Sequence, residues 1–158
     1  TLMKKTIMNK WVKALRSGKY KQCREKLCNV NGQTGEESFC CLGVLTDLYL
    51  KDRKQQKKGP GIKNFNTYTK KDMDYEHDFS KWEVDGEEGC LPGEVAKWAG
   101  FNTITDDYKT GCFSNGKKEI DLAMLNDGGL NPLDYSKKTP SKSFKQIADV
   151  IEKNYEHI

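Results

Sequence analysis

Basic and aromatic side chains alternate near the N-terminus, in a pattern that suits a phosphate and a base. Arginine and lysine neutralise phosphate oxygens, and an aromatic ring offers a flat face for stacking. The stretch therefore predicts a site for a small anionic ligand of the nucleotide type. The alternative is an ordinary solvated helix, because Lys13 and Arg16 share a face away from Trp11. The predicted ligand-binding residues in this stretch are Trp11, Arg16, Lys19, Tyr20, Arg24 and Lys26.

A second polar pair stands at the predicted end of a helix in the C-terminal half. Asn126 and Asp127 follow the apolar residues 122–125 and precede two glycines. An amide and a carboxylate can read the edges of a base or a ribose through hydrogen bonds. We therefore add both residues to the predicted ligand-binding set.

Two adjacent cysteines supply an enzymatic alternative. Cys40 and Cys41 stand at the expected start of a helix, where a thiolate is stabilised, and His77 is the base that could serve them. A thiol hydrolase or a degrader of cyclic nucleotides would use these groups. Buried apolar positions are the commoner fate of free cysteines. The sequence leans away from an enzyme, because the Walker, dinucleotide, Gly-x-Ser-x-Gly and His-Glu-x-x-His motifs are absent.

Acidic residues concentrate in the middle of the chain. Four of them alternate between Asp72 and Asp78, but His77 occupies the position where a calcium-binding EF-hand loop needs glycine. We interpret the stretch as a solvated acidic loop. A third functional hypothesis is an inhibitor that binds a host protein through the acidic segment 72–88, as a nucleic-acid mimic. Cysteine spacing does not fit zinc, so the sequence predicts no metal and no cofactor.

Charge is divided unevenly along the chain. Residues 1–63 carry 15 lysines and arginines against 5 acidic residues, whereas residues 64–158 carry 12 against 18. The first part is therefore strongly basic and the second acidic. A basic half favours an anionic ligand. The alternative is that the two halves face each other, within one fold or between subunits.

Hydrophobic periodicity predicts the elements that must position these residues. Short strands are expected near residues 26–30 and within 101–118. The connector 130–142 is far longer than the turn of a helix-turn-helix, which argues against sequence-specific DNA binding. Helices are expected from Asn9 to the stop at Ser17-Gly18, at 39–50, 91–100 and 120–126, and from a capping box that opens at Ser143.

These elements predict a small single-domain α+β fold, with about four helices in an apolar core and short antiparallel strands at one side. The length of 158 residues suits one domain. Residues 1–8 are expected to form a loose N-terminal arm and residues 9–158 the globular domain, with a basic loop at 51–63. We expect no membrane association, because no apolar run approaches the roughly 18 residues of a membrane helix.

Several sequence blocks stand out in a fixed order and cover about half of the chain. They are WVKALRSGKYKQ at 11–22, FCCLGVL at 39–45, LPGEV at 91–95, LND at 125–127 and FKQIADVIE at 144–152. In this combination the chain resembles a family of small accessory proteins that tailed bacteriophages encode widely. The resemblance implies a phage origin and the host cytoplasm as the compartment. It carries over no catalytic residues.

Small phage proteins of this kind often act against host defence. One such group resembles molecular sponges, which hold the nucleotide-derived signals of Thoeris-type or CBASS-type immunity in basic pockets, often between subunits. By analogy of class, the chain is expected to be a counter-defence protein that sequesters a small anionic immune signal without turnover. The expected partners are a nucleotide-type ligand and further copies of the chain in a homo-oligomer.

Overall fold

The protein is described by a computed structural model that covers residues 3–31, 33–55, 66–67, 79–83, 87, 89–101, 111–131 and 134–158. In chain order its elements are α1 (Lys5–Arg16), β1 (Lys21–Gln22), β2 (Cys28–Asn31), β3 (Glu37–Phe39), α2 (Cys41–Gln55), β4 (Asn66–Thr67), β5 (Phe79–Glu83), α3 (Gly93–Ala99), β6 (Cys112–Ser114), β7 (Glu119–Asp121), α4 (Leu122–Asp127), β8 (Gly129–Asn131), β9 (Asp134–Thr139), α5 (Phe144–Lys153) and the 3-10 helix η3 (Tyr155–His157).

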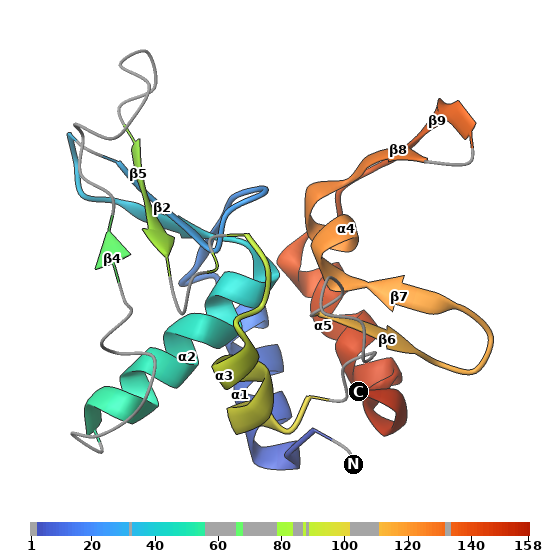
Figure 1. The fold of residues 1–158 in the computed structure, drawn as a ribbon, viewed down its shortest axis with the longest axis horizontal. Coiled ribbons are helices and arrows are strands. Elements are labelled where there is room, and N and C mark those ends of the chain that lie inside the picture. The colour runs from blue at the N-terminus through green and yellow to red at the C-terminus, as the bar shows by residue number, and fades with distance from the viewer. Residues whose placement is uncertain are drawn as a thin grey trace.

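The predicted fold class is confirmed, because these elements form a small single-domain α+β fold. Figure 1 shows α2 and a twisted sheet on one side, and α4 with two hairpins on the other. Helices α1 and α5 pack against each other and join the two sides. Among the described residues, no helix combines the length and the apolar character needed to cross a membrane.

Helix α1 starts earlier than the sequence predicted. It begins at Lys5 rather than Asn9, and Met3 and Ile7 are already buried in the core. The backbone N–H of Met3 donates to the carbonyl of Ile158 at 2.7 Å, so the two ends of the chain meet. The expectation of a loose arm over residues 1–8 is therefore wrong for residues 3–8, which are held by apolar packing and hydrogen bonds.

Helix α2 is the central buried helix that the apolar run at 39–50 predicted. Leu42, Leu45 and Tyr49 are completely buried along one of its faces. Gly43 lies against the backbone of the strand-forming segment, and a Cβ added there would stand 1.7 Å from the carbonyl oxygen of Leu27. Only glycine permits that approach. The helix continues to Gln55, so the first part of the predicted basic loop 51–63 is helical, and residues 56–63 lie outside the described chain.

The largest sheet has the strand order β1-β3-β2-β5-β4. Strands β2 and β3 pair antiparallel with Cys28 opposite Phe39, and β5 pairs antiparallel with the other edge of β2. Strand β1 departs from the predicted antiparallel pattern, because it pairs parallel to β3. Its two residues reach the sheet edge after the turn that follows α1, so no tight hairpin connects them to β3.

The C-terminal half contains two hairpins. The expected β excursion is present as the β6–β7 pair, with Phe113 opposite Ile120. Strand β7 takes the first residues of the predicted helix 120–126, which therefore begins at Leu122. The second hairpin, β8–β9, occupies the segment predicted as a connector and projects from the body (Figure 1).

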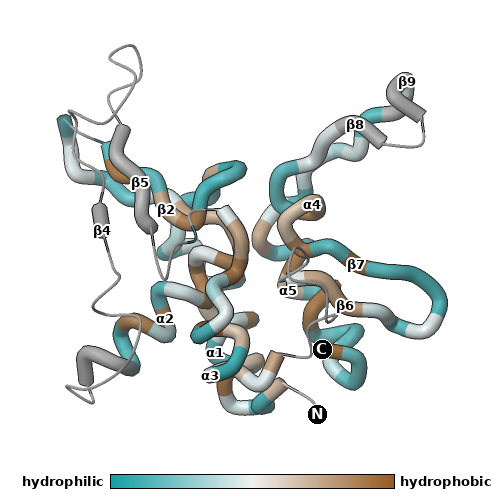
Figure 2. The backbone as a smooth tube through the Cα atoms, in the orientation of Figure 1, coloured by the Kyte–Doolittle hydropathy of each residue, from teal (hydrophilic) through white to brown (hydrophobic). Residues whose placement is uncertain are grey.

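The remaining helix predictions are confirmed at their ends. Helix α3 stops at Gly100, which adopts the left-handed conformation. Helix α5 opens with the predicted capping box, in which Ser143 and Gln146 exchange side-chain and backbone hydrogen bonds. Figure 2 shows that apolar residues gather where the helices meet, whereas the β6–β7 turn is hydrophilic.

Candidate functional site

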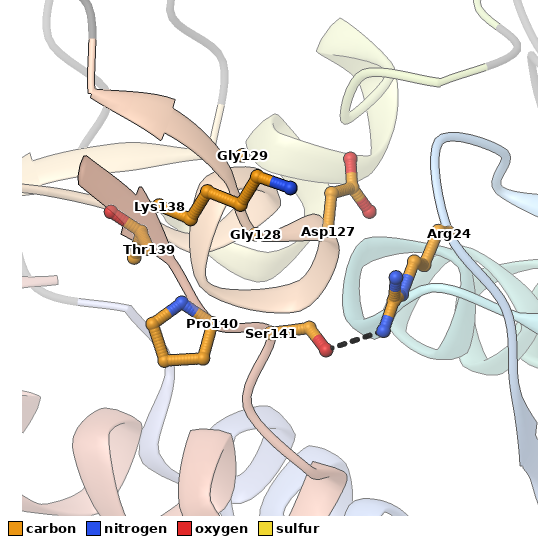
Figure 3. A pocket seen from close by; sticks show the side chains of 8 residues that line it. All are labelled: Arg24, Asp127, Gly128, Gly129, Lys138, Thr139, Pro140 and Ser141. Carbon is orange, nitrogen blue, oxygen red and sulfur yellow. Dashed lines mark hydrogen bonds between the residues drawn. The ribbon is translucent and has the colours of Figure 1, made fainter. Parts of the chain in front are cut away.

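A surface pocket of about 550 Å³ lies between the segment that joins β1 to β2 and the base of the β8–β9 hairpin. This volume falls within the roughly 300–1,000 Å³ typical of small-molecule sites. Its lining combines two cations, one carboxylate, two hydroxyl groups and exposed backbone (Figure 3). The lining residues are Arg24, Asp127, Gly128, Gly129, Lys138, Thr139, Pro140 and Ser141.

The cations of the pocket come from opposite sides of it. Arg24 precedes β2, and its guanidinium donates a hydrogen bond to the hydroxyl oxygen of Ser141 at 2.7 Å. Lys138 extends from β9, and its ammonium end points toward Asp127 in Figure 3. Neither cation forms an ion pair with a described residue. One of the five N–H groups of Arg24 is thus occupied, and the charges of both cations remain available to a ligand.

Asn126 immediately precedes Asp127 of the pocket lining and connects three segments of the chain. Its Oδ1 accepts from the side chain of Gln22 at 2.9 Å and from the backbone N–H of Cys41 at 3.1 Å. Its Nδ2 donates to the carbonyl of Cys23 and to Asp127 Oδ1, both at 2.8 Å. All the polar atoms of this amide therefore have partners within the protein.

Asp127 is oriented by the same network. Its Oδ1 also accepts a hydrogen bond from the backbone N–H of Glu25 at 2.9 Å. Glu25 has a φ of 64°, which is uncommon for a residue other than glycine. The bond to Asp127 stabilises this turn, and the turn places the neighbouring Arg24 at the pocket.

Only two of the predicted ligand-binding residues line the pocket, and the others lie elsewhere in the fold. The structure brings Arg24 and Asp127 together in the lining of one pocket. The prediction that Asn126 binds the ligand is wrong, because its side chain is completely buried and has no surface to offer a base or a ribose. Lys138 and Ser141 line the pocket but were not predicted. The sequence predicts a connector over this segment, and only the folded hairpin brings it to Arg24.

The prediction that Trp11 stacks on a ligand base is also wrong. Its side chain has no exposed surface, and its indole N–H donates to the carbonyl of Cys41 at 2.9 Å. The ring also lies against Phe101, with their centroids 6.3 Å apart. Trp11 is therefore part of the core and cannot stack on a ligand base.

The other predicted cations lie away from the pocket lining. Arg16 pairs with Asp149 at 2.7 Å and with Glu152 at 3.1 Å on the surface of α5. These carboxylates raise its pKa. The basic N-terminal part therefore meets the acidic C-terminal part within one chain at this point. Lys19 is exposed and Lys26 is half-buried, and neither lines the pocket.

The ring of Tyr20 is covered on two sides. The rings of Tyr20 and Phe39 meet edge to face with their centroids 5.1 Å apart. The ammonium of Lys51 stands 5.4 Å from the centroid of the Tyr20 ring. The hydroxyl of Tyr20 donates to Asp47, which also pairs with Lys51 at 2.8 Å. Burial is the main cause that raises the pKa of Tyr20, and the hydrogen bond to Asp47 raises it further. The residue therefore tethers α2 to the sheet and does not line the pocket.

The thiols of the enzymatic alternative are buried. Cys40 is 3% exposed and Cys41 is completely buried. Burial raises the pKa of Cys40 to about 12 and that of Cys41 well above its ordinary value. Both are therefore protonated and inaccessible near neutral pH, unlike a nucleophilic cysteine. The predicted base, His77, lies outside the described residues, as does most of the acidic segment 72–88.

The pocket lining offers hydroxyl groups and charged side chains to a ligand. The hydroxyl groups of Thr139 and Ser141 make no hydrogen bond to a carboxylate or an imidazole among the described residues, and Ser141 accepts from Arg24. In the same part of the chain, no group of three or more His, Cys, Asp or Glu side chains is placed to hold a metal ion. Two cations with a fixed carboxylate can instead hold an anion that also carries hydrogen-bond donors.

The fold and the pocket together define a small α+β domain with a polar surface site. The chain belongs to the family described as a domain of unknown function, DUF8296, whose model matches residues 3–155. Comparisons with curated proteins and with solved structures returned no significant match.

Proposed function

We propose that this protein binds a small phosphate-bearing anion in the pocket between Arg24 and Lys138 and holds it without turnover. The observation that carries the proposal is the approach of two cations, from segments more than one hundred residues apart, to one pocket where neither has an ion-pair partner among the described residues. Charge-assisted hydrogen bonds to phosphate are about twice as strong as neutral ones.

The biological setting of this proposal comes from the resemblance to phage accessory proteins. In that setting the ligand is a nucleotide-derived signal of host immunity, and the protein counters defence by sequestering it in the host cytoplasm. The pocket described above is formed within one chain, so the proposal does not require the homo-oligomer that the analogy to sponges implies. Burial of Cys40 and Cys41 supports retention of the ligand over its degradation.

Isothermal titration of the purified protein with a panel of mononucleotides and cyclic dinucleotides tests the proposal. We expect Arg24→Gln and Lys138→Gln each to weaken binding by about tenfold, because a hydrogen bond to a charged group contributes about 1.5–3 kcal/mol. The matched control is Lys10→Gln, which removes an exposed lysine of α1 that does not line the pocket. It should bind as the wild type does.

Two results would contradict the proposal. One is an affinity that is equal in wild type, Arg24→Gln and Lys138→Gln, which would put the ligand elsewhere. The other is the absence of binding by every compound of the panel. Mass spectrometry of the recovered ligand checks turnover, since a ligand that returns with an altered mass would favour the enzymatic alternative.

A further inference from the structure

Asp127 places a carboxylate in a pocket whose other charged side chains, Arg24 and Lys138, favour anions. In the view of Figure 3 its carboxylate lies between the side chains of Lys138 and Arg24. It forms an ion pair with neither of them. A carboxylate at this place repels a second negative charge on a ligand. The pocket is therefore not built for a bare polyanion.

The two oxygens of this carboxylate have different surroundings. Oδ1 accepts from the backbone N–H of Glu25 at 2.9 Å and from Nδ2 of Asn126 at 2.8 Å. Oδ2 accepts no hydrogen bond from a described residue. Since the amide of Asn126 is completely buried and itself fully bonded, the carboxylate is held in one orientation. Its second oxygen is left for a donor from outside the protein.

We infer that Asp127 determines specificity by accepting a hydrogen bond from a ligand hydroxyl, while Arg24 and Lys138 hold the phosphate of the same ligand. The inference rests on the proposed function and narrows its ligand class. The ligand is a sugar phosphate or a nucleotide with a free ribose hydroxyl, and inorganic polyphosphates are disfavoured. A hydroxyl that donates to a carboxylate forms a strong, charge-assisted bond without adding charge.

The probes are adenosine 5′-monophosphate, its 2′,3′-dideoxy analogue and inorganic pyrophosphate, titrated calorimetrically into the intact protein. The first two share their base and their phosphate and differ only in the ribose hydroxyl groups. We expect wild type to bind the monophosphate at least about tenfold more tightly than the dideoxy analogue, as one charge-assisted hydrogen bond predicts. Pyrophosphate should bind more weakly than the monophosphate.

Asp127→Asn should abolish the preference for the ribose hydroxyl groups and favour pyrophosphate. It keeps an oxygen that can accept from Glu25 and Asn126, but it replaces Oδ2 with an N–H donor and removes the negative charge. Binding of the monophosphate should fall to the level of the dideoxy analogue, and binding of pyrophosphate should tighten several-fold. Asp149→Asn is the control, since it neutralises an exposed aspartate that does not line the pocket. It should leave the ratio of the two nucleotides unchanged.

The outcomes separate the two proposals. If wild type binds both nucleotides with the same affinity, or if Asp127→Asn preserves the wild-type ratio, the role of Asp127 is overturned and the phosphate site stands. If neither these probes nor any compound of the nucleotide panel binds, the proposed function fails and the inference fails with it. The wild-type comparison needs no variant, so it decides the question even where Asp127→Asn folds poorly.

Discussion

Asn126 is a binding residue in the sequence-based hypothesis and a structural residue in the fold. Its amide joins Gln22, Cys23 and Cys41 to the end of α4. A buried polar group is costly unless its donors and acceptors are all paired, and this amide is paired throughout. Asn126 therefore holds the segments next to the pocket together, and it orients Asp127 from a completely buried position.

Replacing this amide removes the hydrogen-bond partner of two backbone groups, the buried N–H of Cys41 and the carbonyl of Cys23. We expect Asn126→Ala to lower the free energy of unfolding by at least about 2 kcal/mol, because each orphaned buried group costs about 1–3 kcal/mol. Asn9→Ala is the matched control on the exposed face of α1, where alanine favours the helix, and it should be neutral or slightly stabilising. Urea unfolding followed by circular dichroism measures both. Equal stability of the two variants would contradict the role of Asn126.

At the scale of elements, the junction between α4 and β8 decides how the pocket closes. Gly128 has a φ of +69°, and a Cβ added there would stand 2.7 Å from the carbonyl oxygen of Thr139 and 2.8 Å from the N–H of Ser141. The helix end and the last residues of the hairpin thus touch through their backbones. Only this close approach puts Asp127 and Ser141 on the same pocket wall.

A methyl group at Gly128 must therefore displace one wall of the pocket. We expect Gly128→Ala to destabilise the fold by more than about 1 kcal/mol, because both the positive φ and the backbone contact oppose a side chain. Nucleotide affinity should fall with it, since Ser141 would move relative to Arg24. Gly93→Ala provides the comparison, because nothing lies within 4 Å of its added Cβ, and it should be neutral or mildly stabilising. Thermal unfolding measures the change in stability, and calorimetry measures the change in nucleotide affinity. A Gly128→Ala variant with unchanged stability would refute this packing.

At the scale of the whole molecule, four of the six cysteines are buried. Cys28, Cys40 and Cys41 are among them, and burial raises the pKa of each of these three. A thiol with a raised pKa stays neutral in the folded protein at a pH where it already ionises in the unfolded chain. Its contribution to stability is therefore complete below about pH 9, the ordinary value, and is lost as the pH rises toward 12.

The protein should accordingly lose stability steeply in alkali. Above pH 9 the free energy of unfolding should fall by up to about 1.4 kcal/mol per pH unit for each buried thiol. Cys40→Ala should reduce this slope, whereas Cys90→Ala, at an exposed position, should change it less. Urea titrations between pH 8 and pH 11 give the slopes. A slope in Cys40→Ala equal to that of wild type would exclude this thiol as a titrating group.

The sequence predicted the helices more completely than the strands. Apolar periodicity located α2, and end signals such as Gly100 and the capping box at Ser143 marked helix ends that the structure confirms. The β8–β9 hairpin was missed because its second strand, Asp134–Thr139, has the polar sequence DYSKKT without alternating apolar residues. Its pairing with β8 comes from backbone hydrogen bonds, which leave no pattern in the sequence.

By itself the sequence determined the fold class, the main apolar faces and the presence of a basic N-terminal stretch beside a polar helix end. These properties depend on residues close together in the chain, where periodicity and capping act. Only the tertiary structure decided which polar groups reach solvent. It placed Trp11 and Asn126 in the interior and brought Arg24 to Ser141, 117 positions away along the chain. Burial and long-range contact depend on how the faces pack, and local spacing carries no record of that.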